Sequence, residues 1–329
     1  MNAHAPIADA FLEVQNLSVV YPLRAGVSIR AVTDLSFSLA LGETLGLVGE
    51  SGCGKSSAAR AIMQLPRPSS GQVRLGGTDL TALRGRRLQQ ARRRFQMVFQ
   101  DPIASLNPRQ SVRQILSAPL EIAGIRESRA EREKRIIEIL DRVGLNGAQI
   151  IDRRPYEFSG GQCQRISIAR SLILRPELLV CDESVSALDV SVQAQILNLL
   201  QEIRQEFGLT MLFISHDLSV VRHVSDRVAV MYLGALCELA GTEAIYASPA
   251  HPYTRALISA VPQPDPNIAP PPLQMVPGEL PSPMNPPSGC RFRTRCPLAT
   301  ERCAAEVPAF RQIAPGQSVA CHHPLTGRG

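Results

Sequence analysis

The sequence predicts an α/β protein in which a mostly parallel sheet is covered by helices on both faces. Apolar runs at 44–48, 177–183 and 210–216 have the length and composition of buried strands. The segments between them include runs with apolar residues at helical spacing, and such alternation is typical of a parallel sheet. With 329 residues, 44% of them hydrophobic, the chain is long enough for about two domains.

Additional strands are expected before and after the first buried strand. β-type runs occupy 11–20 and 35–41 and precede the strand at 44–48, and hairpin-like pieces surround 72–77. Alternating short strands joined by turns are typical of antiparallel pairing. We therefore expect an antiparallel β subdomain beside the parallel sheet.

Helical patterns account for most of the remaining chain. Helices are expected at 56–65, through most of 111–174, and at 190–207. The last of these should end at Gly208, because glycine favours the left-handed conformation that closes helices. The long middle region predicts an inserted α-helical subdomain at about 102–174.

Composition argues against several functions. The formal net charge is +6, but the chain has no tryptophan and only 4% aromatic residues, so it has few stacking platforms for single strands. We expect no nucleic-acid partner. The longest nearly apolar stretch, 228–237, is far shorter than the roughly 20 residues of a membrane-spanning helix. The first residues lack a secretion signal, which predicts a reducing compartment where the eight cysteines are thiols or ligands.

The C-terminal part of the chain has a different composition. Eleven of the 26 prolines lie within 262–287, a density that excludes helix and central strand, so 261–289 is expected to be a linker. Residues 290–329 hold four of the eight cysteines and few aliphatic residues. We therefore expect a principal domain at 1–260, the linker, and a small cysteine-containing region at 290–329.

The segment GESGCGKS at 49–56 fits the phosphate-loop pattern, and it stands between a predicted strand and a predicted helix. Its glycines let backbone N–H groups curl round phosphate oxygens. Lys55 can reach the β and γ phosphates, and the Ser56 hydroxyl can ligate Mg²⁺ at the helix N-terminus. The glycines are Gly49, Gly52 and Gly54.

The segment LLVCDE at 178–183 supplies the acidic half of such a site. An apolar strand that ends in a carboxylate can hold Mg²⁺ opposite the phosphates, which assigns Asp182 to the metal. Glu183 could take a proton from the attacking water. An isolated Asp-Glu pair would more simply be a solvated strand end, but the phosphate loop upstream favours the catalytic interpretation.

The segment FSGGQCQR at 158–165 predicts a second anion site. Ser159, Gly160 and Gly161 stand at the start of a helix, where a hydroxyl, exposed N–H groups and the positive end of the helix dipole favour anions. One chain therefore carries two sites suited to phosphate.

The order of these motifs, with Gln100 in VFQ, SALD at 186–189 and His216, resembles the ATP-binding subunits of ABC transporters over about residues 11–260. The resemblance implies a P-loop NTPase core and an ATPase coupled to transport. It also implies a head-to-tail pair of identical or homologous subunits, in which the signature serine and glycines of one chain cap the ATP on the phosphate loop of the other.

The resemblance also implies roles for individual residues. Tyr21 would stack on adenine, although a tyrosine after two valines is also typical of strand-end packing. Gln100 would ligate Mg²⁺, sense the γ phosphate and signal to the membrane partner, and His216 would contact the γ phosphate. Asp189 would lie at the dimer seam. Ser57 and Gln162 complete the expected nucleotide contacts.

Longer runs of residues indicate which group of ABC transporter ATPases the chain resembles. QDPIASLNPR, SALDVSVQAQ, ISHDLSVV, MYLG and HPYTRAL, followed by a proline-rich tail, look like the ATPases of dipeptide and oligopeptide importers, a group that includes some nickel importers. This implies two membrane permease subunits, an external binding protein and a position at the cytoplasmic face of the inner membrane. Three residues depart from the usual pattern without removing a reacting group: Ser57, Cys163 and Ser184.

Four cysteines in the tail, Cys290, Cys296, Cys303 and Cys321, can bind one metal centre in a reducing compartment. Their spacing matches neither zinc ribbons nor bacterial ferredoxins, so zinc, an iron-sulfur cluster and two disulfides all remain open. Resemblance to the peptide-importer tail implies a 4Fe-4S cluster.

Three other classes of protein share parts of this pattern. Chromosome or repair ATPases place long coiled coils between the phosphate loop and the signature, whereas only about 100 residues separate them here, without sustained heptads. Tandem translation-factor ATPases need two such domains in one chain. A metal-cluster redox sensor with an accessory ATPase would respond to oxidants without hydrolysing ATP.

Overall fold

The computed structural model describes residues 10–23, 27–186, 188–261 and 279–325. The chain divides into two compact units, one formed by 1–81 with 213–329 and the other by 82–212. Most of the expected proline-rich linker, residues 262–278, lies outside the described residues.

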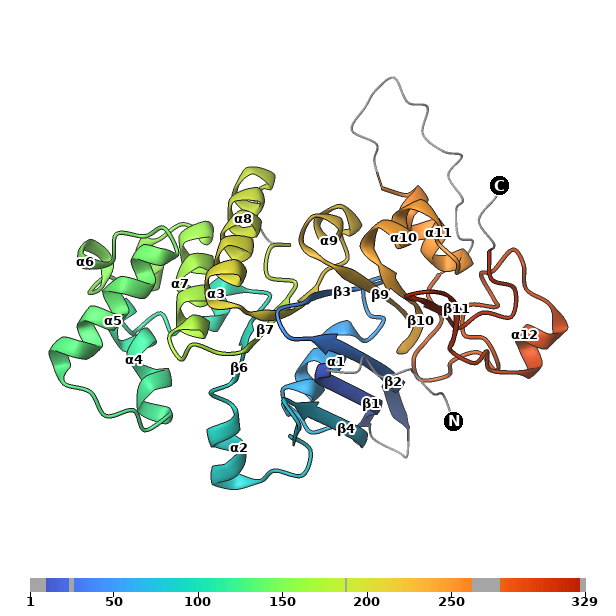
Figure 1. The fold of residues 1–329 in the computed structure, drawn as a ribbon, viewed down its shortest axis with the longest axis horizontal. Coiled ribbons are helices and arrows are strands. Elements are labelled where there is room, and N and C mark those ends of the chain that lie inside the picture. The colour runs from blue at the N-terminus through green and yellow to red at the C-terminus, as the bar shows by residue number, and fades with distance from the viewer. Residues whose placement is uncertain (1–9, 24–26, 187, 262–278, 326–329) are drawn as a thin grey trace, which may run out of the picture. The chain divides into compact units, whose positions relative to one another are not determined.

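The first unit contains an antiparallel sheet built from the N-terminal strands (Figure 1). Its order is β2-β1-β4-β5, and Val14 of β1 pairs with both Phe37 of β2 and Val73 of β4. All three of these side chains are buried. This sheet is the expected antiparallel subdomain, with bounds β1 (Ala10–Pro22), β2 (Ser28–Ala40), β4 (Ser70–Leu75) and β5 (Thr78–Asp79).

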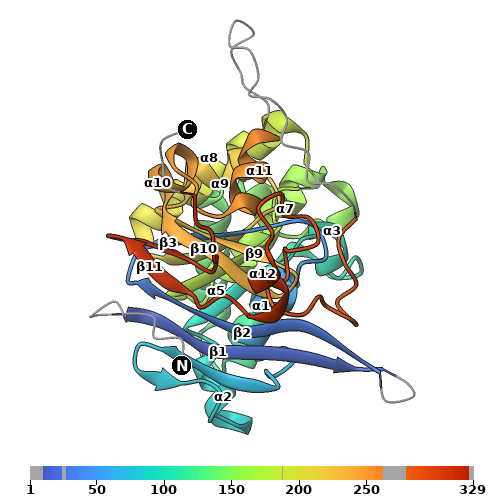
Figure 2. The same ribbon diagram turned by 90° about the vertical axis from the view of Figure 1, so that its right-hand side faces the viewer.

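A second, mixed sheet in this unit carries the phosphate loop. β3 (Thr44–Val48) runs parallel to β9 (Arg227–Tyr232), and β9 forms an antiparallel hairpin with β10 (Ala235–Gly241). Two tail strands continue the order, because β12 (Gln317–Val319) pairs antiparallel with β10 and then with β11 (Arg311–Ala314). Figure 2 labels β10 and β11. The tail is thus joined to this sheet by backbone pairing.

Five helices of the first unit are α1 (Lys55–Ile62), α9 (Leu218–Val224), α10 (Thr242–Ala247), α11 (Pro252–Ser259) and α12 (Glu301–Ala305). α1 directly follows the phosphate loop, and Asp217 caps α9 by accepting hydrogen bonds from the backbone N–H groups of Ser219 and Val220.

The second unit is mainly helical and includes one parallel strand pair, β6 (Phe95–Val98) with β7 (Leu178–Asp182). Serine capping boxes start α4, α5 and α7. The helices of this unit are α2 (Gly85–Ala91), α3 (Pro102–Ser105), α4 (Val112–Ile122), α5 (Arg129–Arg142), α6 (Gly147–Ile150), the 3₁₀ turn η2 (Pro155–Glu157), α7 (Gly160–Leu172) and α8 (Val190–Phe207).

The α/β architecture and the antiparallel subdomain agree with the sequence expectation, but the sheet is mixed where a mostly parallel one is expected. The reason is local: Gly234, with φ of +80°, turns the chain directly from β9 into β10, so these neighbours must be antiparallel. The buried strands are as expected, since every residue of β3, β7 and β8 (Thr210–Ile214) is buried. Among the described helices, none is long and apolar enough to cross a membrane.

Candidate functional site

The phosphate loop connects β3 to α1, and close backbone approaches require two of its glycines, Gly49 and Gly54, whereas a Cβ at Gly52 would meet nothing within 4 Å. A Cβ at Gly54, whose φ is +104°, would stand 2.1 Å from the carbonyl oxygen of Ala31. A Cβ at Gly49 would stand 2.2 Å from the carbonyl oxygen of Met231. Real Cβ atoms do not approach oxygens so closely, so the loop can pack against β2 and β9 only with glycine at these positions.

Lys55 directs its ammonium group at the loop itself. The side chain is buried, and Nζ donates hydrogen bonds to the carbonyl oxygens of Gly49, at 2.8 Å, and Glu50, at 3.1 Å. A buried ammonium needs such acceptors, because burial without partners is costly. The loop therefore holds a buried positive charge, the Lys55 ammonium group, against its own carbonyl groups.

Two predicted nucleotide contacts lie near this loop within the same unit. The hydroxyl of Tyr21 donates a hydrogen bond to Ser57 Oγ in the first turn of α1, at 3.4 Å. His216 follows β8, and the N–H of the preceding Ser215 donates to the carbonyl of Leu47 in β3, at 3.3 Å. The exposed His216 is therefore anchored beside the strand that leads into the phosphate loop.

The acidic residues and Gln100 belong to the second unit. β6 and β7 run parallel with Val98 paired to Cys181, so Gln100 and Glu183 both follow strand ends at one edge. Gln100 Nε2 donates a hydrogen bond to Glu183 Oε2 at 3.1 Å. Asp182 is buried, whereas Glu183 is half-buried and has φ of +47°, an uncommon conformation for a residue other than glycine.

The signature segment starts helix α7 with a reciprocal pair of hydrogen bonds. Ser159 Oγ accepts from the N–H of Gln162 at 3.3 Å, and Gln162 Oε1 accepts from the N–H of Ser159 at 3.0 Å. Gly161 lies against α8, since a Cβ there would come within 2.6 Å of Val192 Cγ1. Asp189 is exposed at the start of α8 and makes no side-chain capping bond there.

Comparison with known proteins decides the family. The ABC transporter family matches residues 32–186, and the oligopeptide/dipeptide transporter C-terminal region matches 237–303. A probable peptide ABC transporter ATP-binding protein of Sinorhizobium fredii is 52% identical, covering 96% of this chain and 90% of the relative. The oligopeptide transport ATP-binding protein AppF of Bacillus subtilis is 50% identical, covering 95% of this chain and 97% of its own.

This chain belongs to the ATP-binding subunits of ABC transporters. It is of the oligopeptide and dipeptide import type, as the sequence motifs predict, and is an ABC transporter ATPase. Subunits of this kind dimerise and pair with the permease components of a transporter.

Solved structures agree with the ATPase fold. The dimeric ATP-binding cassette MJ0796 bound to ADP and phosphate aligns with a TM-score of 0.64 and 27% identity, covering 70% of this chain and 98% of the cassette. CbiO1 of Clostridium perfringens aligns with a TM-score of 0.63 and 27% identity, covering 73% and 92%.

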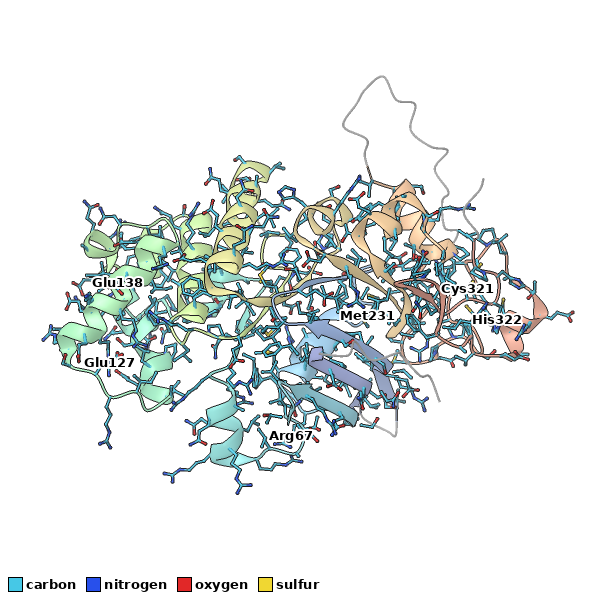
Figure 3. The ribbon with its side chains drawn as sticks, viewed as in Figure 1. Arg67, Glu127, Glu138, Met231, Cys321 and His322 are labelled. Carbon is cyan, nitrogen blue, oxygen red and sulfur yellow. The ribbon has the colours of Figure 1, made fainter. Side chains whose placement is uncertain are left out.

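The four tail cysteines of the ABC ATPase line one small space. His251 and Phe292 line the same space, and burial raises the pKa of the Cys321 thiol to about 11. In Figure 3, Cys321 and His322 are labelled in this C-terminal region. Among the described residues, however, no three His, Cys, Asp or Glu side chains are grouped so that they could hold a metal ion.

Three further residues at the phosphate loop are not predicted from the sequence: Glu50, Tyr253 and Arg295. Arg295 Nη1 donates to both carboxylate oxygens of Glu50, at 3.1 and 2.8 Å, and the hydroxyl of Tyr253 accepts from the N–H of Glu50 at 2.9 Å. Tyr253 belongs to the HPYTRAL run, which indicates a family resemblance but no contact with the phosphate loop. Nothing in the sequence indicates Arg295, because 245 positions separate it from Glu50.

Proposed function

We propose that the loop at 49–56 binds the phosphates of ATP, with Lys55 reaching the β and γ phosphates and Tyr21 stacking on adenine. The observation that carries this proposal is the loop itself: a buried strand, two glycines, Gly49 and Gly54, without room for a side chain, and a buried ammonium held by loop carbonyls. ATP phosphates would compete with those carbonyls for Lys55 Nζ. Gly52 and Ser57 would also contact the nucleotide.

The ligands proposed for Mg²⁺ are Ser56, Gln100 and Asp182. Hydroxyl, amide and carboxylate oxygens are the donors that Mg²⁺ prefers. Bound Mg²⁺ would neutralise charge on the β and γ phosphates. The position of Asp182 at the end of β7 fits this role, because a carboxylate that ends an apolar strand can hold Mg²⁺ opposite the phosphates.

Glu183 is the proposed general base for hydrolysis, with His216 contacting the γ phosphate. Gln100 Nε2 donates a hydrogen bond to Glu183 Oε2 and so orients the carboxylate that would accept a proton from water. The left-handed backbone at Glu183 is consistent with this role, since such strain clusters at functional sites. Gln100 would also relay the state of the γ phosphate to the permease.

Two such subunits, identical or homologous, would pair head to tail. The signature of each chain would cap the ATP of the other, and Asp189 would lie at the seam. The exposed start of α7 and the exposed Asp189 support this arrangement, because both are accessible to a partner. The capping residues are Ser159, Gly160, Gly161 and Gln162.

The pair would power the import of dipeptides or oligopeptides through two separate permease subunits, with cargo delivered by an external binding protein. The names of the relatives favour peptides over nickel as cargo. The subunit would act at the cytoplasmic face of the inner membrane, without a nucleic-acid partner. We retain the layout of an ATPase domain at 1–260, a linker at 261–289 and a cysteine region at 290–329.

Glu183→Gln should retain ATP binding and abolish turnover, because the amide keeps the shape of the carboxylate but cannot take a proton. ATP affinity and phosphate release would be measured for the full chain, in the assembled transporter where turnover requires it. Lys55→Ala, as the contrasting variant, should lose ATP binding. Normal phosphate release by the Glu183 variant would remove Glu183 from the base role.

We also propose that Cys290, Cys296, Cys303 and Cys321 hold a 4Fe-4S cluster, with zinc as the alternative. All four line one space, which supports a shared centre. One zinc ion would draw the four sulfurs to about 2.3 Å from a single point. A four-iron cluster would take one thiolate on each iron, so its four sulfurs would stand farther apart than around a single zinc ion.

Anaerobic purification followed by iron, sulfide and zinc analysis tests this centre. Iron and sulfide in equal amounts, lost in Cys296→Ser, are expected, together with visible absorption. Stoichiometric zinc without iron would replace the cluster by a zinc site. Four freely titratable thiols with no metal would eliminate the centre.

A further inference from the structure

Glu50, the second residue of the phosphate loop, is held at three points. Its carboxylate accepts both hydrogen bonds from Arg295 Nη1, its backbone N–H donates to the hydroxyl of Tyr253, and its carbonyl accepts from Lys55 Nζ. Two of these three partners lie outside the loop, and Arg295 belongs to the cysteine-bearing tail. The conformation of the loop therefore depends on residues far along the chain.

The Arg295 side chain is buried between Glu50 and Tyr232. Its side chain is only 9% exposed, and its guanidinium lies 5.8 Å from the ring centroid of Tyr232 and 3.4 Å from that residue's hydroxyl. A guanidinium removed from water requires a carboxylate or comparable acceptors, and Glu50 supplies them. The ion pair thus joins a buried guanidinium to a carboxylate that is 28% exposed.

Tyr253 is held in place by contacts with two other aromatic rings. Its buried ring packs edge-on against Tyr232, with centroids 4.8 Å apart, and against Phe292 at 5.3 Å. Phe292, like Arg295, lies between the first two tail cysteines. Such ring contacts orient the Tyr253 hydroxyl toward the N–H of Glu50.

The tail segment 290–296 makes a second contact beside the loop. Arg291 Nη1 donates to the carbonyl of Leu233 in the β9–β10 turn. The N–H of the next residue, Gly234, donates to the carbonyl of Cys53 in the phosphate loop at 2.7 Å. The segment therefore supports the loop both through Glu50 and through this turn.

We propose that Arg295 and Tyr253 position the phosphate loop through Glu50, so that the cysteine-bearing tail sets how tightly the loop binds nucleotide. A loop held in its binding conformation loses less conformational freedom when phosphate arrives, and binding is correspondingly tighter. The inference rests on the proposed ATP site at 49–56. Arg295 and Tyr253 are positioning residues, since their contacts are to Glu50 rather than to the phosphates.

The test is a double-mutant cycle on the full-length ATPase with a fluorescent, non-hydrolysable ATP analogue and Mg²⁺ as the probe. Arg295→Met and Glu50→Gln should each raise the dissociation constant about tenfold, the usual scale of a lost charged hydrogen bond. The double variant should be no worse than either single variant, because the two side chains act through each other. Arg295→Lys should recover part of the affinity.

Tyr253→Phe provides a second, independent variant. Phenylalanine keeps the ring contacts but leaves the N–H of Glu50 without its acceptor, so nucleotide binding should weaken while the melting temperature without nucleotide changes little. Arg302→Met is the matched control, because Arg302 also precedes a tail cysteine but is 63% exposed and pairs with Glu306 of the tail. It should bind the analogue as the wild type does.

The outcomes separate this inference from the ATP site itself. Failure of the wild type to bind the analogue would refute the ATP site. If the wild type binds and Lys55→Ala does not, wild-type affinity in both Arg295→Met and Tyr253→Phe would overturn the positioning role alone. Additive losses in the double variant would also overturn it. Should Arg295→Met fail to fold, Glu50→Gln combined with Arg295→Lys closes the same cycle.

Discussion

At the scale of single residues, glycines with the same backbone requirement differ in what surrounds them. Gly42, in the turn before β3, and Gly54, in the phosphate loop, have φ of +75° and +104°. A Cβ at Gly42 would meet nothing within 4 Å, whereas one at Gly54 would collide with the carbonyl of Ala31. A side chain would strain the backbone at both positions, but only at Gly54 would it also collide with a neighbouring atom.

Gly54→Ala should therefore destabilise the protein more than Gly42→Ala. The left-handed conformation alone costs about 1 kcal/mol for alanine, which is the expected loss at Gly42. Displacement of the Ala31 carbonyl should bring the loss at Gly54 to about 3 kcal/mol. Urea unfolding of both variants measures the difference, and equal losses would contradict the steric argument.

At the scale of elements, an ion pair joins the starts of β6 and β7. The carbonyl of Arg94 accepts from the N–H groups of Glu177 and Leu178, and the Arg94 guanidinium donates to both carboxylate oxygens of Glu177 at 2.6 and 2.9 Å. These hydrogen bonds hold the pKa of the Glu177 carboxyl below its usual 4.5. The pair sets the register that places Gln100 beside Glu183 at the far ends of the strands.

This ion pair should contribute an acid-sensitive part of the stability. A carboxyl whose pKa is lowered by folding stabilises the protein above its unfolded pKa, and the contribution is lost as pH falls through the folded value. Glu177→Gln should cost about 0.5 kcal/mol at pH 7, because both side chains are partly exposed and solvent screens them. The difference from wild type should shrink as pH falls below 4.5 and vanish once pH has passed below the lowered pKa of the folded state, as followed by urea unfolding.

Glu138→Gln is the control for this prediction, since Glu138 is exposed and its Lys134 partner lies 3.9 Å away. It should change stability little at either pH. A Glu177 variant whose deficit persists unchanged well below pH 4.5 would mean that the carboxylate charge is not the source of the stabilisation.

Elements fixed by local chemistry were predictable, and contacts between distant segments were not. The bounds expected for β3 and α8 agree with the structure because they depend on local sequence features, namely the apolar run of β3 and the Gly208 that ends α8. The phosphate loop is predictable for the same reason. The mixed sheet and the Glu50–Arg295 pair depend on segments that are distant in the sequence and meet only after folding. Short motifs do not indicate which distant segments will pair.

At the scale of the whole molecule, each chain carries one phosphate loop and one signature segment. In the proposed head-to-tail pair, an ATP site combines the loop of one chain with the signature of the other. The separate contributions can be tested only by mixing lesions, because a lesion in every chain damages both sites equally.

Ser159→Ala should impair hydrolysis in trans. Chains carrying Lys55→Ala and Ser159→Ala would be co-expressed with different tags, and phosphate release would be measured in the assembled transporter. Random pairing makes half of the dimers mixed, and each mixed dimer has one intact site, so about a quarter of wild-type sites should return. The control replaces the Lys55 variant by the Lys55 and Ser159 double variant, which can form no intact site. Equal activity in the two mixtures, with all variants folded and paired, would argue against the head-to-tail site.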